Sequence, residues 1–268
     1  MLERSGKKRV GFGAMGLLIL GVLFAWLLSR GDAGLAYNWQ WYRVGRYILG
    51  VEGGRIVFGP LMQGLAVTLK ITACSLLLAA LFGLVTALLR LSSSPVGRLL
   101  AFLYLELIRN TPLLVQIFFL YFVLAPVFSL NRFTAAVLAL SLFEGAYASE
   151  IIRAGICSIE RGQWEAAYSL GLSRLHTYRA VILPQAIRRI MPPLTGQAVS
   201  LVKDSALVST IAVYDLTMQG RTIIAETFLT FEIWFTVAGI YLLINLSLSG
   251  FSGYLARKLA CSGWHHGG

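Results

Sequence analysis

Charged residues are scarce in this chain of 268 residues: Asp, Glu, Lys and Arg make up 13% of it, against about 25% in soluble domains. Cysteine is also rare, with three residues, and so is histidine, with three. Their spacing matches no metal site and no disulfide framework. No cofactor motif and no nucleophile beside a general base is apparent. These absences argue against a soluble domain, a metal centre and a membrane enzyme.

Apolar residues are correspondingly abundant, at 57% of the chain, and the mean hydropathy is +0.73. Runs of about 20 such residues cross a bilayer as helices. In a soluble chain the formal net charge of +11 would suggest nucleic acid. In a membrane protein, Lys and Arg instead mark the cytoplasmic side. The sequence therefore predicts an all-α polytopic membrane protein that contacts lipid and binds no nucleic acid.

The apolar runs predict six transmembrane helices, at about residues 10–29, 61–89, 99–124, 133–156, 188–213 and 233–256. Trp26, Leu27 and Leu28 at the end of the first run favour an uncleaved anchor, although a signal peptide has a similar basic start and Ala33 and Ala36 would allow cleavage. Residues 31–59 are rich in Trp and Tyr, which is typical of a membrane interface. The fifth run contains Pro192-Pro193, where we expect it to break, and residues 214–232 form a polar connection.

The distribution of basic residues predicts the orientation. Six spans place both termini on one side of the membrane. The segments on that side hold more than twice as many Lys and Arg residues as the segments on the other. Both termini, and the polar loop between the fourth and fifth spans, are therefore expected in the cytoplasm.

The polar loop, residues 158–184, reads as two helices joined by a turn. A first helix is expected over residues 161–168, and Gly171 favours a left-handed turn after it. Ser173 is a candidate N-cap for a second helix over residues 174–182, and Pro184 closes the unit. Arg161 and Glu165 lie one turn apart on the first helix, so they can pair.

This loop resembles the EAA loop of ABC importer permeases. The pattern of that family is E-A-A, three residues, G, nine residues and I-x-L-P, and only Val181 departs from it. The resemblance implies a coupling helix that docks in a cleft of a cytoplasmic ATPase. The residues expected to couple the two proteins are Arg161, Glu165, Ala166, Ala167, Gly171 and Pro184.

Other stretches resemble the polar amino acid uptake branch of these permeases, of the histidine, glutamine and glutamate type. They are Gly64-Leu65-x-x-Thr68-Leu69, Glu106-x-x-Arg109-Asn110-Thr111-Pro112, Tyr147-x-x-Glu150-x-x-Arg153-x-Gly155-Ile156 and Lys203-Asp204-Ser205. The resemblance implies a type I importer core of five spans over residues 60–258. Residues 1–59 then add an extra helix and an interfacial segment, and residues 259–268 form a cytoplasmic tail.

The resemblance also implies partners. No G-x-x-x-x-G-K-[ST] pattern occurs, so ATP and Mg would be bound by a separate ATPase dimer and this chain would not be an enzyme. A second permease subunit, identical or homologous, and an extracytoplasmic amino acid binding protein complete the expected importer of the bacterial inner membrane. A secondary transporter or channel is the alternative, but such a protein has no ATPase for the loop to dock on.

Ionisable residues in the spans are candidates for a substrate path. Glu106 and Arg109 share a helix face, as do Glu150 and Arg153, so each pair either forms an ion pair that lowers the cost of insertion or contacts substrate.

Lys203, Asp204 and Ser205 either line the path or hold two half-helices together. In the third span, Pro112 is expected to kink or start a helix, with Asn110 and Thr111 satisfying the freed carbonyl groups.

Overall fold

The computed structural model describes residues 22, 26, 37–52 and 55–261. All but two positions of the first expected span, and the tail from residue 262, lie outside the described residues. The chain divides into two units, Met1–Arg43 and Val44–Gly268. The first contains a short 3-10 helix, η1 (Trp41–Arg43), and the second contains the elements that follow.

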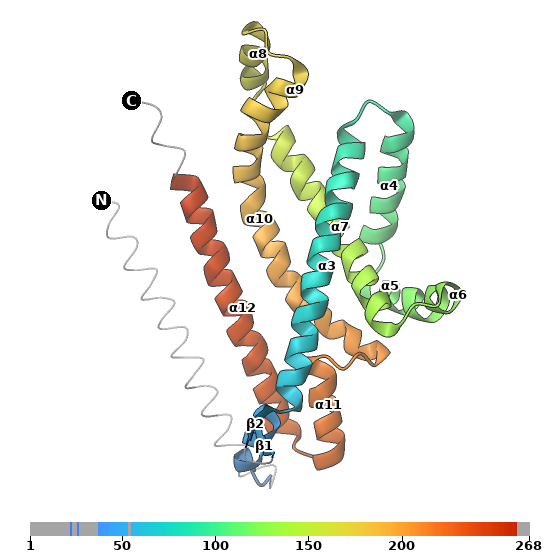
Figure 1. Cartoon of the computed structure of the whole chain (residues 1–268), viewed down its shortest axis with the longest axis vertical. Coiled ribbons are helices and arrows are strands. Elements are labelled where there is room, and N and C mark those ends of the chain that lie inside the picture. The colour runs from blue at the N-terminus through green and yellow to red at the C-terminus, as the bar shows by residue number, and fades with distance from the viewer. Residues whose placement is uncertain (1–21, 23–25, 27–36, 53–54, 262–268) are drawn as a thin grey trace. The chain divides into compact units, whose positions relative to one another are not determined.

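The second unit is helical apart from one hairpin (Figure 1). In it β1 (Leu49–Glu52) pairs antiparallel with β2 (Arg55–Phe58), a feature that the sequence did not predict. The helical elements are α2 (Gly45–Ile48), α3 (Pro60–Leu91), α4 (Pro95–Arg109), α5 (Leu113–Phe118), η2 (Phe119–Leu124), α6 (Ala125–Phe128), α7 (Arg132–Cys157), α8 (Arg161–Ser169), α9 (Arg174–His176), η3 (Thr177–Ile182), α10 (Leu183–Asp204), η4 (Ser205–Ile211), α11 (Leu216–Thr227) and α12 (Thr230–Cys261).

Within the described residues, three helices are long and apolar enough to cross a membrane: α3, α7 and Thr230–Tyr254 of α12. A fourth span is possible if α4 and the segment Leu113–Phe128 count as one, but these two are bent by 105°. The third expected span is therefore sharply bent at Pro112. The count of six remains a prediction.

The bend occurs where the sequence predicted a kink. Pro112 precedes α5 as its N-cap, and it has no N–H with which to continue α4. The side chain of Asn110 donates to the carbonyl of Glu106 at 2.8 Å, and Thr111 donates to that of Leu107 at 2.8 Å. Both side chains thus satisfy carbonyl groups at the end of α4, as predicted.

The fifth expected span differs from the prediction. Helix α10 continues through Pro192 and Pro193, and the change to 3-10 geometry comes at Ser205. The carbonyl groups that the two prolines leave without their helical N–H partners belong to Arg188 and Arg189, both of which are exposed residues. The expected polar connection also contains a helix, α11.

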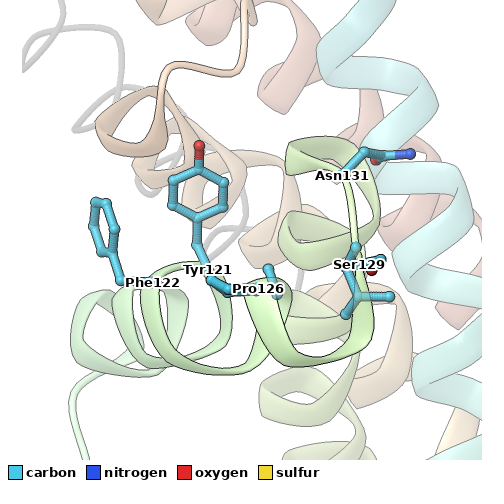
Figure 2. A pocket seen from close by; sticks show the side chains of 7 residues that line it. Tyr121, Phe122, Pro126, Ser129 and Asn131 are labelled. Carbon is cyan, nitrogen blue, oxygen red and sulfur yellow. The ribbon is translucent and has the colours of Figure 1, made fainter.

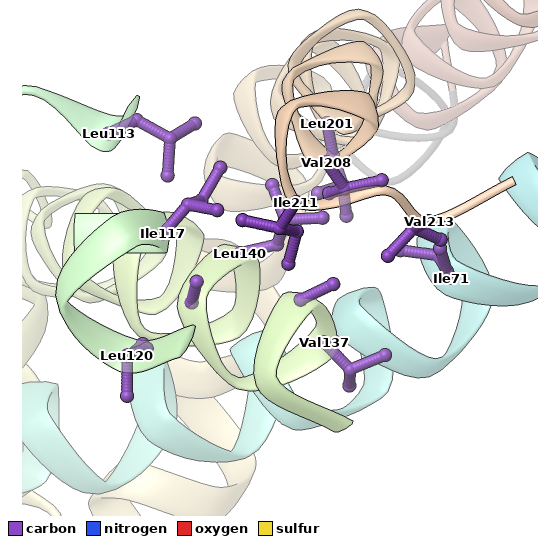
Figure 3. Close-up of a cluster of buried hydrophobic side chains, with 12 residues drawn as sticks. Ile71, Leu113, Ile117, Leu120, Val137, Leu140, Leu201, Val208, Ile211 and Val213 are labelled. Carbon is purple, nitrogen blue, oxygen red and sulfur yellow. The ribbon is translucent and has the colours of Figure 1, made fainter. Parts of the chain in front are cut away.

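The largest buried cluster lies where α3, α5, α7 and the α10–η4 junction meet (Figure 3). Ile71, Ile117, Leu140 and Val208 point into it from four different elements. Helix α3 packs along α7 because glycines let the backbones approach. A Cβ added at Gly83 would lie 2.8 Å from that of Ala148.

Candidate functional site

The polar loop folds as the predicted pair of helices with a turn between them. Helix α8 is followed by Gly171 at φ +74°, in the left-handed region that glycine adopts without a Cβ penalty. The N–H of Leu172 donates to the carbonyl of Ala167 at 3.1 Å, and that of Gly171 to Tyr168 at 2.9 Å. These two bonds form a Schellman motif, which ends the helix and fixes the direction of the chain.

The second helix of the loop does not end at Pro184. The side chain of Ser173 accepts from the N–H of His176 at 3.4 Å, which confirms the predicted N-cap. From Arg174 the chain stays helical through the π-helical η3 into α10, where Pro184 occupies the first turn. The expectation that this proline closes the unit is wrong, because the chain stays helical across it, and the hydrogen-bond pattern changes in the π-helical η3 just before it. The loop and α10 are therefore one continuous helical element.

The two loop helices pack on each other through an apolar seam. The rings of Trp164 and Tyr178 meet edge to face, with centroids 4.9 Å apart. Ala167 is buried, whereas Ala166 is exposed on the surface of α8. The side chain of Arg189 donates to the carbonyl of Ser158 at 2.5 Å, which ties α10 to the end of α7.

The outer surface of the loop is exposed and carries unexpected leucines. Leu170 and Leu175 are 80% and 77% exposed and flank the turn at Gly171. Arg161 and Glu165 are also exposed and, within the described residues, form no ion pair. These two leucines in a polar loop were the sequence signal for a contact surface. Our interpretation of the motif did not include them.

The Lys203-Asp204-Ser205 stretch lies at the junction of α10 and η4, and its side chains differ in environment. Lys203 is exposed and Asp204 is partly buried. Ser205 is fully buried, and its hydroxyl donates to the carbonyl of Val202 at 2.7 Å. Ser205 therefore packs against its own helix, and only the first two residues offer charge to a ligand.

The structure adds Glu144 of α7 to this region. Its carboxylate is 2% exposed, and Oε2 accepts from the side-chain amide of Gln197 at 2.6 Å. Asp204 is an electrostatic neighbour of Glu144. Among the described atoms, Oε1 of Glu144 has no hydrogen-bond partner. A lone carboxylate in an apolar span was the signal for this residue, and the motifs did not contain it.

Four other ionisable residues, from α3, α4 and α7, form a cluster between these helices. The predicted Glu150–Arg153 pair is confirmed at 3.1 Å. Within the described residues, Glu106 and Arg109 do not form an ion pair with each other. Glu106 accepts a hydrogen bond from the side chain of Asn110 at 2.7 Å, while Arg109 lies 3.9 Å from Glu150. Glu150 also forms an ion pair with Arg90 of α3, which the sequence did not predict.

Two cavities lie away from these residues. One of about 570 Å³ is lined by Tyr121, Phe122, Ser129 and Asn131 beside the turn into α7 (Figure 2). The other, of about 430 Å³, is apolar and lies at the α4–α5 bend. No group of His, Cys, Asp and Glu in the described part of the chain could hold a metal ion. The chemical features of the molecule are therefore the loop and the two polar clusters.

Known proteins resemble most of the chain. Residues 75–260 match the family described as binding-protein-dependent transport system inner membrane component. The glutamine transport system permease protein GlnP of Escherichia coli (strain K12) is 41% identical over 202 residues, covering 74% of this chain and 92% of that protein. The L-cystine transport system permease protein TcyB of Bacillus subtilis (strain 168) is 40% identical over 206 residues, covering 75% and 88%.

A solved structure shows the same architecture. The crystal structure of an amino acid ABC transporter with histidines superimposes with a TM-score of 0.70 at 40% identity. It covers 74% of this chain and 94% of that one. The matched family region contains the whole loop and begins after the first expected span.

Proposed function

Because the chain belongs to the family of binding-protein-dependent transport system inner membrane components, we propose that it is the permease subunit of an ATP-driven importer for polar amino acids. Its similarity to glutamine, cystine and amino acid transporters supports this substrate class. Residues 60–258 would form the permease domain, after an N-terminal anchor segment and before a short tail. Both termini and the loop would face the cytoplasm of a bacterial inner membrane.

The observation that carries the proposal is the build of the loop. Helix α8 is fixed by the Schellman turn at Gly171 and by the Trp164–Tyr178 contact. Leu170, which directly follows α8, and Leu175 of α9 are exposed on either side of that turn. A rigid helix pair with exposed leucines is suited to a cleft in a partner protein. We assign that partner as a cytoplasmic ATPase dimer that binds ATP and Mg, with residues 161–171 as the docking segment.

The continuous helix from the loop into the membrane explains how docking could act at a distance. Since α9, η3 and α10 form one helical element, a displacement of the loop moves the far end of α10, where Asp204 meets η4. ATP binding would close the ATPases and move the loops of two permease subunits together, which shifts the spans between inward-facing and outward-facing states. An extracytoplasmic binding protein would deliver the amino acid.

The substrate route is proposed at the end of α10. Asp204 there lies near the buried Glu144 of α7, which pairs with Gln197 of α10, and the exposed Lys203 precedes Asp204 in the chain. An amino acid carries one carboxylate and one ammonium group, and this region offers a charge of each sign. An uptake assay on Asp204→Asn tests the role: unchanged transport would remove an ionised Asp204 from the route.

The uptake of a panel of labelled amino acids, by cells that express this chain with its ATPase and binding protein, tests the function. Gly171→Val places a β-branched residue in a left-handed conformation, which costs about 1–2 kcal/mol or more, so uptake should fall roughly tenfold at an unchanged membrane level. Gly171→Asn, which tolerates this conformation, should transport normally. Uptake that persists without any ATPase would establish a secondary transporter instead.

A further inference from the structure

Four charged side chains meet where α3, α4 and α7 approach one another, and their charges do not balance. Glu150 of α7 pairs with Arg90 at the end of α3. It lies 3.1 Å from Arg153 and 3.9 Å from Arg109 at the end of α4. Among the described residues, no carboxylate other than that of Glu150 lies within ion-pair distance of the three arginines. We call these four residues the arginine cluster; it carries two positive charges in excess.

The excess charge lies between the helices at partly exposed positions, and Arg109 is the most exposed of the four. The side chains of the arginine cluster are only 23% to 47% exposed. The guanidinium carbon of Arg109 lies 5.9 Å from the ring centre of Tyr147, which adds a cation–π contact. Nε of Arg153 is buried and has no hydrogen-bond partner among the described atoms. Ionisable groups at such positions normally pair or coordinate a ligand, so the buried donor and the uncompensated charge suit an anionic ligand.

We propose that the arginine cluster binds the phosphate group of an anionic phospholipid. Guanidinium groups bind phosphate through paired hydrogen bonds, so this donor set fits the headgroup. Three guanidinium groups would repel the ammonium group of a zwitterionic amino acid and the quaternary amine of phosphatidylcholine. A phosphodiester without a cationic headgroup satisfies the excess charge without that repulsion.

The position of the cluster favours a lipid. Arg90 is the penultimate residue of α3, and Arg153 lies four residues before the end of α7. In the orientation proposed above, on which this inference rests, both helix ends face the cytoplasm, where anionic headgroups lie. Leu88 beside Arg90, and Leu103 and Leu107 on the helix of Arg109, are 54% to 66% exposed. These leucines provide an apolar surface for acyl chains.

Native mass spectrometry of the intact detergent-purified transporter, titrated with phosphatidylglycerol or phosphatidylcholine, tests the proposal. The wild type should retain phosphatidylglycerol preferentially. Arg109→Gln should weaken that retention at least about tenfold, the loss of one charge-assisted contact. Arg109→Lys, which keeps the charge, should retain most of it. Arg98→Gln removes an exposed arginine of the same helix that forms no ion pair within the described residues, and it should behave as wild type.

Two competition arms identify the source of the anion. Retention of phosphatidylglycerol in the presence of millimolar inorganic phosphate, and in the presence of the amino acid panel, supports the lipid as the ligand. Displacement by phosphate would keep the anion site but overturn the lipid, and displacement by an amino acid would assign the cluster to the transported substrate. Equal retention of both lipids, or equal behaviour of Arg109→Gln and Arg98→Gln, would overturn the proposal. The readout needs no transport, so a failure here is distinguishable from a failure of the importer assignment.

Discussion

One hydroxyl holds the start of α11 against α3, and its removal should destabilise the protein by a predictable amount. Thr68 and Leu216 are both fully buried, and the N–H of Leu216 donates to Oγ1 of Thr68 at 3.1 Å. The backbones are close here, because a Cβ added at Gly64 would lie 2.7 Å from the carbonyl oxygen of Asp215. Water therefore has no room to replace the hydroxyl.

The substitution Thr68→Val keeps the shape of the side chain but leaves a buried N–H without an acceptor, which costs about 1–3 kcal/mol. At about 2 kcal/mol, the apparent Tm of the purified protein in detergent should fall by roughly 4–8 °C. Thr86→Val is the matched control, since Thr86 is a buried residue of the same helix whose hydroxyl makes no hydrogen bond within the described residues. The control should change the Tm by less than about 2 °C. If the two variants unfold at the same temperature, the hydrogen bond to Leu216 does not contribute as argued.

Two further predictions concern close packing and pH. Gly155→Ala would place a Cβ 2.2 Å from Cγ1 of the buried Ile190. We therefore expect it to lower the free energy of unfolding by about 1–3 kcal/mol. Gly196→Ala is the control: its Cβ would meet no described atom within 4 Å, so it should be neutral or stabilising in the same thermal assay. Burial raises the pKa of the Asp215 carboxyl to about 6, whereas the unfolded value is about 3.9. The folded protein thus binds the proton of Asp215 more tightly than the unfolded chain does. This proton binding stabilises the folded state by about 3 kcal/mol at most. The stabilisation is complete below about pH 4 and is lost as the pH rises through about 6. Thermal unfolding of Asp215→Asn across this range should lack that contribution, and an identical pH profile in both proteins would refute it.

Features set by neighbouring residues were predictable from the sequence. The turn at Gly171, the N-cap at Ser173 and the kink at Pro112 each follow from the backbone chemistry of one or two residues, and the structure confirms them. The resemblance to the family was visible in the sequence for a similar reason, because its pattern lies within one continuous stretch of the chain. The apolar runs also predicted the bounds of α3 and α7 to within a few residues.

Features set by contacts between distant segments were not predictable. Arg90 and Glu150 are 60 residues apart, so helical periodicity could pair Glu150 only with Arg153 on its own helix. The same limitation produced the wrong Glu106–Arg109 pair. The expected break at Pro192-Pro193 was also wrong, since the helix continues through both prolines, and the tertiary fold can override such a local preference.

The motif residues that identify the family make packing contacts, and these contacts do not identify the substrate. Gly64 and Thr68 serve the close approach of α3 to α11, and Gly155 serves that of α7 to α10. These roles are packing roles, which any permease of this architecture needs whatever it transports. Glu144 lies outside every motif, yet it is a buried carboxylate with an oxygen that has no partner among the described atoms. The substitution Glu144→Gln keeps the size of the side chain and removes its charge, so it should change the discrimination between amino acids. Substitutions at the packing residues should instead lower stability and the uptake of all amino acids alike.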